Sequence, residues 1–163
     1  LYHKSWLFSF FAKTIQTAIE SENFPEKNFD ISGYQLAPKI SYLFSKNTSW
    51  DIFYELQKKE NQIGVSETLL QNRFGTAFSY SGTKKFTMNG EVSFYQNKFD
   101  GNEFSSVGFQ MLEGLQTGQN LTWRLLLQNN ITQFLDINFN YQGRKSETSQ
   151  AIHTGNVQLR AYF

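Results

Sequence analysis

Catalytic chemistry is suggested at one place in the sequence, around His153. This histidine follows a short polar segment, residues 146–149, which contains Ser146 and Glu147. A serine nucleophile, a histidine base and an orienting carboxylate are the components of a hydrolase or acyltransferase site. Serine, threonine and glutamate are common in polar loops, however, and the other histidine, His3, lies near the opposite end of the sequence. We therefore expect no enzymatic activity.

Cofactor, metal and nucleic-acid chemistry find no support in the residue types. The chain has no cysteine, and neither histidine stands at metal-ligand spacing from another ligand. The glycine-containing segments 101–108 and 114–118 match no phosphate-binding pattern. Lys and Arg total 15 against 14 Asp and Glu, so the chain lacks the basic surplus of a nucleic-acid-binding protein. We expect no cofactor, no metal site and no nucleic-acid partner.

Along most of the sequence, polar and apolar residues alternate with a period of two, which predicts β-strands. Five runs show this most clearly: residues 49–56, 86–94, 121–128, 134–144 and 155–163. Residues 33–44, residues 73–80 and a weaker run after Ser105 extend the pattern, and a further strand is possible within 5–19, although residues 13–21 also show helical spacing. Turn signals separate the runs at 45–49, 81–85, 97–103, 115–120 and 129–133.

This pattern predicts an all-β, antiparallel, up-and-down meander of about eight strands. The short, regular connections favour a closed barrel over a sandwich. We expect residues 1–163 to form a single unit, with a clear meander over 29–163 and a first strand and loop within 1–28. Pro38 removes a backbone donor and is therefore expected at a sheet edge or bulge.

The solvent that each face meets decides between two classes of barrel. In a lipocalin-like binding barrel the apolar face points inward, whereas in an outer-membrane barrel it points to lipid and the lumen is polar. Aromatic residues make up 17% of the chain, more large rings than a small barrel interior holds comfortably. We therefore predict a transmembrane barrel whose aromatic girdle contains Trp50, Tyr80, Trp123 and Tyr141.

The polar face of such a barrel would line its lumen. We predict a lumen cluster made of Arg124, Asp136, Arg160, Glu91 and Arg144. If the last two hairpins turn near residues 131 and 149, Asp136 lies diagonally between Arg124 and Arg160. An Arg-Asp-Arg contact is then expected, because an arginine on the lipid face would cost about 2 to 4 kcal/mol.

The sequence ends on an alternating run that closes with an aromatic residue. This ending resembles the terminal signal that the barrel-assembly machinery recognises in bacterial outer-membrane barrels. The residues that carry the resemblance are Gly155, Val157, Leu159, Ala161 and Phe163, although the glycine usual five positions before the end is replaced by Gln158. The ending therefore predicts that the alternate residues from Val157 to Phe163 face lipid.

Two longer segments, FDGNEFSSVGFQMLEGLQTGQNLTWRLLLQ (99–128) and YQGRKSETSQAIHTGNVQLRAYF (141–163), carry a second resemblance. They are similar to the carboxy-terminal region of large, mostly uncharacterised outer-membrane proteins of the Bacteroidota. The resemblance implies a bacterial outer-membrane location and a chain that is the end of a longer polypeptide. It also implies partners: the lipid bilayer, the barrel-assembly machinery and other outer-membrane or periplasmic proteins.

These observations lead to one principal hypothesis and two alternatives. The chain is expected to be a barrel of about eight strands, or the carboxy-terminal section of a larger barrel, serving as a membrane anchor or as a subunit of a secretion, barrel-assembly or import complex. A soluble lipocalin-like binding barrel is the first alternative, and an outer-membrane lipase, protease or acyltransferase is the second. With the carboxy-terminus in the periplasm, strand parity makes the 145–152 loop extracellular but places the long 58–67 segment on the periplasmic side.

Overall fold

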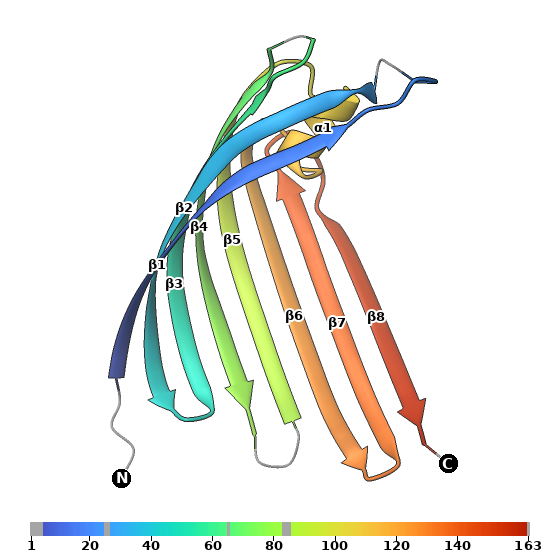
Figure 1. The fold of residues 1–163 in the computed structure, drawn as a ribbon. Coiled ribbons are helices and arrows are strands. Elements are labelled where there is room, and N and C mark those ends of the chain that lie inside the picture. Colours follow the sequence, from blue (N-terminus) through green and yellow to red (C-terminus); the bar gives the residue numbers. More distant parts are fainter. Residues whose placement is uncertain (1–4, 25–26, 65, 83–85, 163) are drawn as a thin grey trace.

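The computed structural model describes residues 5–24, 27–64, 66–82 and 86–162. This part of the chain forms eight β-strands and one short α-helix (Figure 1). The strands are β1 (Ser5–Ile19), β2 (Phe29–Ser45), β3 (Thr48–Asn61), β4 (Thr68–Ser81), β5 (Phe86–Asp100), β6 (Gly118–Thr132), β7 (Leu135–Ser146) and β8 (Ile152–Ala161). The helix α1 (Ser106–Leu112) lies between β5 and β6.

All eight strands belong to a single antiparallel sheet whose spatial order follows the sequence from β1 to β8. The sheet curves into a trough, with the two termini at one end and α1 at the other (Figure 1). Strands β1 and β8 are its edges, and in the described residues they do not pair with each other. The predicted eight-stranded up-and-down meander is therefore confirmed, as an open sheet.

The connections differ in length between the two ends of the trough. Two residues join β2 to β3, four join β4 to β5, and two join β6 to β7. The opposite end holds the connections 20–28, 62–67, 101–117 and 147–151. We call these the short-turn end and the long-loop end. The 58–67 segment thus lies at the same end as the 145–152 loop. The strand count expected from the sequence had placed these two segments at opposite ends, and the structure removes this conflict.

That conflict arose from the segment after Ser105, which was predicted as a strand and is a helix. Val107, Phe109 and Met111 alternate as in a strand, but Val107, Met111 and Leu112 are buried together while Phe109 is exposed. The Ser105 side chain caps the helix by accepting from the Gly108 amide at 2.9 Å. Without this false strand, and with β1 as a true one, the count is eight.

Pro38 occupies an interior strand, which contradicts the prediction of an edge or bulge. It lies in β2 opposite Phe10 of β1, and the β2–β3 pairing skips Ala37 and Pro38 without a change of register. The sheet therefore accommodates the missing amide by a local gap in one ladder.

The register joins outward-facing positions into rows that cross the whole sheet. One such row consists of Trp6, Tyr42, Trp50, Phe78, Gly90, Leu125, Tyr141 and Gly155. Side chains alternate between faces along a strand, so this row determines which face each of the remaining strand residues occupies. The rows with the same parity carry most of the exposed large apolar residues of the described strands, and the rows of opposite parity carry most of the charged ones.

Candidate functional site

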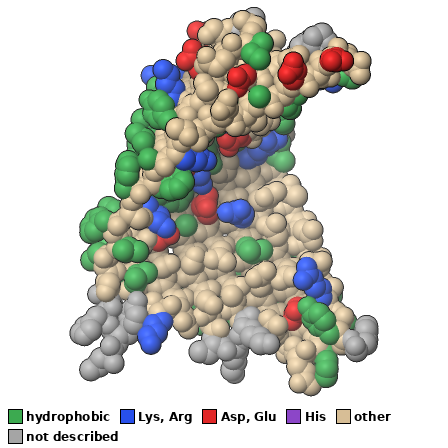
Figure 2. Space-filling view, in the orientation of Figure 1, with side chains coloured by type: hydrophobic (Ala, Val, Ile, Leu, Met, Phe, Trp, Pro, Cys, Tyr) green, Lys and Arg blue, Asp and Glu red, His purple; other side chains and the backbone are tan. Residues whose placement is uncertain are grey.

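The concave face holds a network of charged side chains from four adjacent strands. Figure 2 shows Lys, Arg, Asp and Glu side chains gathered in the hollow of the trough. Arg73 on β4 is central to the network: its Nη2 donates to Glu91 Oε1 on β5 at 2.6 Å, and its Nη1 lies 3.6 Å from Glu55 Oε2 on β3. Arg124 on β6 adds a contact, with Nη2 3.6 Å from Glu91 Oε2. Positive and negative groups thus alternate across β3, β4, β5 and β6.

Packing holds the Arg73 guanidinium in place. Its central carbon lies 4.8 Å from the ring centre of Phe53 and 5.3 Å from that of Tyr95. Phe53 in turn covers Gly75, where an added Cβ would come within 2.4 Å of the ring. Ser93, which is buried, accepts from Arg73 Nε at 3.2 Å. The arginine is therefore fixed by rings, a hydroxyl and two carboxylates, an arrangement that favours a rigid position.

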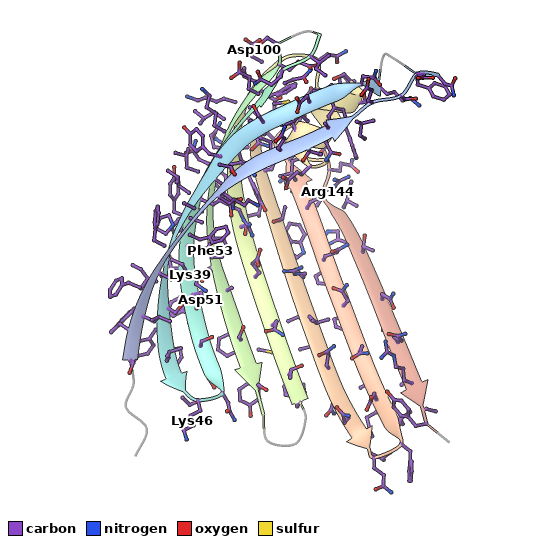
Figure 3. All side chains as sticks on the ribbon, in the orientation of Figure 1. Lys39, Lys46, Asp51, Phe53, Asp100 and Arg144 are labelled. Atoms are coloured by element: carbon purple, nitrogen blue, oxygen red, sulfur yellow. The ribbon has the colours of Figure 1, made fainter. Side chains whose placement is uncertain are left out.

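A second ion pair lies nearer the short-turn end of the concave face. Lys39 Nζ on β2 is 3.4 Å from Asp51 Oδ2 on β3, and both side chains point into the trough (Figure 3). Its lysine is more exposed than the Arg73 network, so its contribution to stability is expected to be small.

Helix α1 fills the concave face at the long-loop end. Its buried residues Val107, Met111 and Leu112 pack against the strand residues Phe29, Ile31 and Leu69. The buried Lys59 ammonium donates to the Met111 carbonyl at 3.0 Å and to Glu113 Oε1 at 2.7 Å. Because a helix carries partial negative charge at its carboxyl end, this lysine stabilises α1 against β3. Helix α1 thus forms a packed plug against the concave face at the long-loop end.

An open cavity of about 690 Å³ lies between this plug and the charged network. Arg73, Arg124, Arg144 and Glu91 contribute to its lining. Arg144 Nη1 donates to the Gly114 carbonyl, just after α1, at 2.6 Å. Figure 3 shows Arg144 at the α1 end of β7. The cavity is therefore polar and is bounded by both cations and anions.

The predicted lumen cluster is only partly brought together. Arg124 and Glu91 are in contact and Arg144 lines the same cavity, but Asp136 and Arg160 lie elsewhere, toward the short-turn end. The β6–β7 turn occupies residues 133–134 instead of 131, so Asp136 faces Asn130 and not the neighbourhood of Arg124. The Arg-Asp-Arg contact was therefore wrongly predicted.

Other partners satisfy the two displaced residues. Asp136 Oδ2 accepts from the Tyr162 hydroxyl at 3.0 Å, and Arg160 Nη2 donates to Gln158 Oε1 at 3.4 Å. Asp136 and Arg160 are cross-strand partners in register, with no ion pair between them in the described part of the chain. Glu55 and Arg73 pair across β3 and β4 in a register that the sequence does not display.

The convex face carries most of the exposed large apolar residues of the described strands. Phe8 and Phe10 on β1, Phe74 on β4, and Val157 and Leu159 on β8 each expose more than half of their surface. In a lipocalin-like barrel this set would line the interior, so the arrangement does not favour that alternative.

The four predicted girdle residues all lie on this convex face. Trp50 and Tyr80 are near the short-turn ends of their strands, whereas Trp123 and Tyr141 are in the middle of theirs. Trp123 lies over Gly143, where an added Cβ would approach the indole ring to 2.3 Å. Only two of the four therefore occupy the strand-end position expected of a girdle.

His153 contacts aromatic residues on the convex face. Its Nδ1 is 2.7 Å from the Tyr141 hydroxyl, and its ring centre is 5.3 Å from that of Trp123. The residues of the polar segment 146–149 make hydrogen bonds to other partners: Ser146 with Asn120, Glu147 with the Gln119 amide and Thr148 with Gln116. In the described residues no hydrogen bond links His153 to them.

The predicted assembly signal lies on the edge strand β8. Gly155, Val157, Leu159 and Ala161 share the convex face, and Arg160 points to the concave one. Phe163 lies outside the described residues. The Tyr162 amide donates to the Phe134 carbonyl at 2.9 Å, which ties the end of β8 to the β6–β7 turn.

Comparisons with protein-family models, with curated proteins and with solved structures find no match for this chain. The resemblance to outer-membrane proteins of the Bacteroidota therefore stays a prediction. Among the described residues, no helix has the length and apolar character needed to cross a membrane. Within the same residues, no group of three or more His, Asp or Glu side chains could hold a metal ion.

Proposed function

We propose that this chain forms part of the wall of a transmembrane β-barrel in a bacterial outer membrane. There it serves as a membrane anchor or as a subunit of an envelope complex for secretion, barrel assembly or import. The observation that carries the proposal is a continuous apolar band on the convex face, opposite a charged concave face. A face that exposes this many large apolar side chains across eight strands needs an apolar surrounding.

The band also runs at the angle expected of a barrel in a bilayer. In β1 the apolar residues Phe8, Phe10 and Ala12 lie on the long-loop side of the row that contains Trp6. In β8 Val157 and Leu159 lie on the short-turn side of the same row. The band therefore shifts by about one residue per strand, a stagger of the kind that accompanies strand tilts of roughly 35–45° in barrels.

The lengths of the connections support an orientation. Outer-membrane barrels have short turns at the periplasmic end and longer loops outside. Here β8 runs toward the short-turn end, and α1 belongs to the long-loop end. We therefore assign the short turns to the periplasm and the α1 plug to the extracellular end.

The two open edges require closure in a membrane. Strands β1 and β8 are exposed along almost their whole length, and each unpaired backbone group would cost several kcal/mol in lipid. In the bilayer β1 and β8 must therefore pair, either with each other or with further strands. The second arrangement makes this sheet a section of a larger barrel and permits a channel.

Membrane integration tests the proposal directly. The chain is folded in detergent, mixed with phosphatidylcholine vesicles and floated in a density gradient, and its gel mobility is compared before and after boiling. We expect flotation and a heat-dependent mobility shift. A chain that stays at the bottom of the gradient and migrates identically in both gels would contradict the proposal.

Two adjacent leucines provide a matched pair of variants. Leu125 faces outward in the row with Tyr141, and Leu126 faces the trough beside Asn89 and Asn140. Leu125→Lys places a charge in the apolar band and should cost about 2 to 4 kcal/mol in the bilayer. Leu126→Lys places the same charge on the polar face and should float as the unmodified chain does. Equal flotation of the two variants would count against the assigned faces.

A further inference from the structure

In the described strands, charged residues on the convex face are confined to one end of the trough. In the described strands these residues are Asp30, Lys58, Glu60, Lys98, Asp100 and Lys145, and all six lie toward the long-loop end. The short-turn end of the same face presents uncharged residues in the described strands, among them Tyr80, Phe86 and Ile137. Figure 3 marks Asp100 at the charged end and Lys46, in the β2–β3 turn, at the other.

The charges follow the same order along three alternate strands of the sheet, which run in the same direction. Strands β3, β5 and β7 leave the apolar band through the sequences Lys58-Lys59-Glu60, Lys98-Phe99-Asp100 and Lys145-Ser146-Glu147. Since alternate residues share a face, each outward lysine is followed one step farther out by an acid. A layer of lysines therefore borders the apolar band, with a layer of carboxylates beyond it.

The three lysines stand within about two residues of one level relative to the band. In register, Lys98 lies about four residues nearer the long-loop end than Lys145, and the band drifts in the same direction from β7 to β5. Lys58 and Lys98 share a row with Leu70 between them, about 10 Å apart across two strand spacings. Two lysine side chains can reach one phosphate group across that distance.

These ammonium groups are available for a ligand. Lys58, Lys98 and Lys145 are exposed, and they make no ion pair or hydrogen bond within the described residues. A shallow groove of about 360 Å³ opens beside Lys58, Leu70 and Lys98. Apolar contact and positive charge thus occur together at the edge of the band.

We propose that Lys58, Lys98 and Lys145 bind the phosphate groups of membrane lipids in the leaflet at the long-loop end. The inference rests on the proposed function, because only a bilayer places a layer of phosphates at the border of an apolar band. Acyl chains cover the apolar side chains, and the lysines compensate the phosphate charge directly above them. The outer carboxylates repel phosphates that lie farther from the bilayer centre and so favour this level.

Lipid binding to matched triple variants tests the inference. Lys58→Gln, Lys98→Gln and Lys145→Gln are combined in one chain, and Lys13→Gln, Lys39→Gln and Lys46→Gln in a control with the same loss of charge. Lipid adducts on the detergent-solubilised proteins are counted by native mass spectrometry with phosphatidic acid or phosphatidylcholine. A further experiment adds inorganic phosphate as a competitor, to distinguish binding of a lipid from binding of free phosphate.

The unmodified chain is expected to prefer phosphatidic acid, and the test triple to lose affinity by about fivefold per lysine. The control triple should stay within about twofold of the unmodified chain, since its lysines lie on other surfaces. An equal loss in the control, displacement by inorganic phosphate, or no preference in the unmodified chain would each overturn the inference. If the chain binds phosphatidylcholine vesicles but does not prefer phosphatidic acid, only the inference about the three lysines is wrong. If the chain does not float with such vesicles, the proposed function is contradicted.

Discussion

The long-loop half and the short-turn half of the trough are stabilised in different ways. At the long-loop end α1 covers the concave face, and its core includes Leu69, Met111 and Leu112, which are almost completely buried. Toward the short-turn end no described residue covers the concave face, and the convex side chains there are exposed or half-buried. One half is thus stabilised within the chain, and the other depends on the medium around it. The predictions below separate these two contributions.

The largest effect is expected from the core beneath α1. Met111→Ala removes a side chain that is fully buried, and large-to-small substitutions of this kind cost about 2 to 5 kcal/mol. Phe109→Ala on the same helix removes an exposed ring and should change the free energy of unfolding by less than about 0.5 kcal/mol. Chemical denaturation in detergent micelles measures both. Similar losses for the two variants would mean that α1 does not pack as described.

A smaller loss is expected where Trp123 covers Gly143. A Cβ at Gly143 would lie 2.3 Å from the indole ring, so Gly143→Ala should cost about 2 kcal/mol through overpacking. Gly155→Ala on β8 meets no atom within 4 Å and should be close to neutral. Thermal unfolding in micelles compares the two variants. If Gly143→Ala leaves the stability unchanged, the Trp123 indole does not lie over Gly143 as described.

The charged network should contribute less than either packing site. Glu91→Gln weakens the contacts with Arg73 and Arg124, and because these side chains keep some exposure to water the expected cost is about 1 kcal/mol. The control Asp136→Asn leaves the network untouched. The loss should shrink as salt concentration rises, and a cost independent of salt would show that charge is not its source.

The sequence predicted the strands better than the contacts between them. Alternation identified the eight-stranded meander and placed Glu91 and Arg124 on one face, because a two-residue period follows directly from strand geometry. The partner of Asp136 was wrong, since a two-residue difference in one turn changes every cross-strand neighbour. The helix after Ser105 was missed because Val107, Phe109 and Met111 also alternate, and only its tertiary contacts separate the two periods.

The central claim is that the convex face meets lipid and the concave face meets water, and labelling of alternate residues tests it most directly. The chain contains no cysteine, so single cysteines at positions 123 to 127 on β6 carry a fluorophore without a background signal. In vesicles, lipid-attached quenchers should reach labels at 123, 125 and 127, and a water-soluble quencher labels at 124 and 126. Uniform quenching along the strand, or the opposite alternation, would contradict the account.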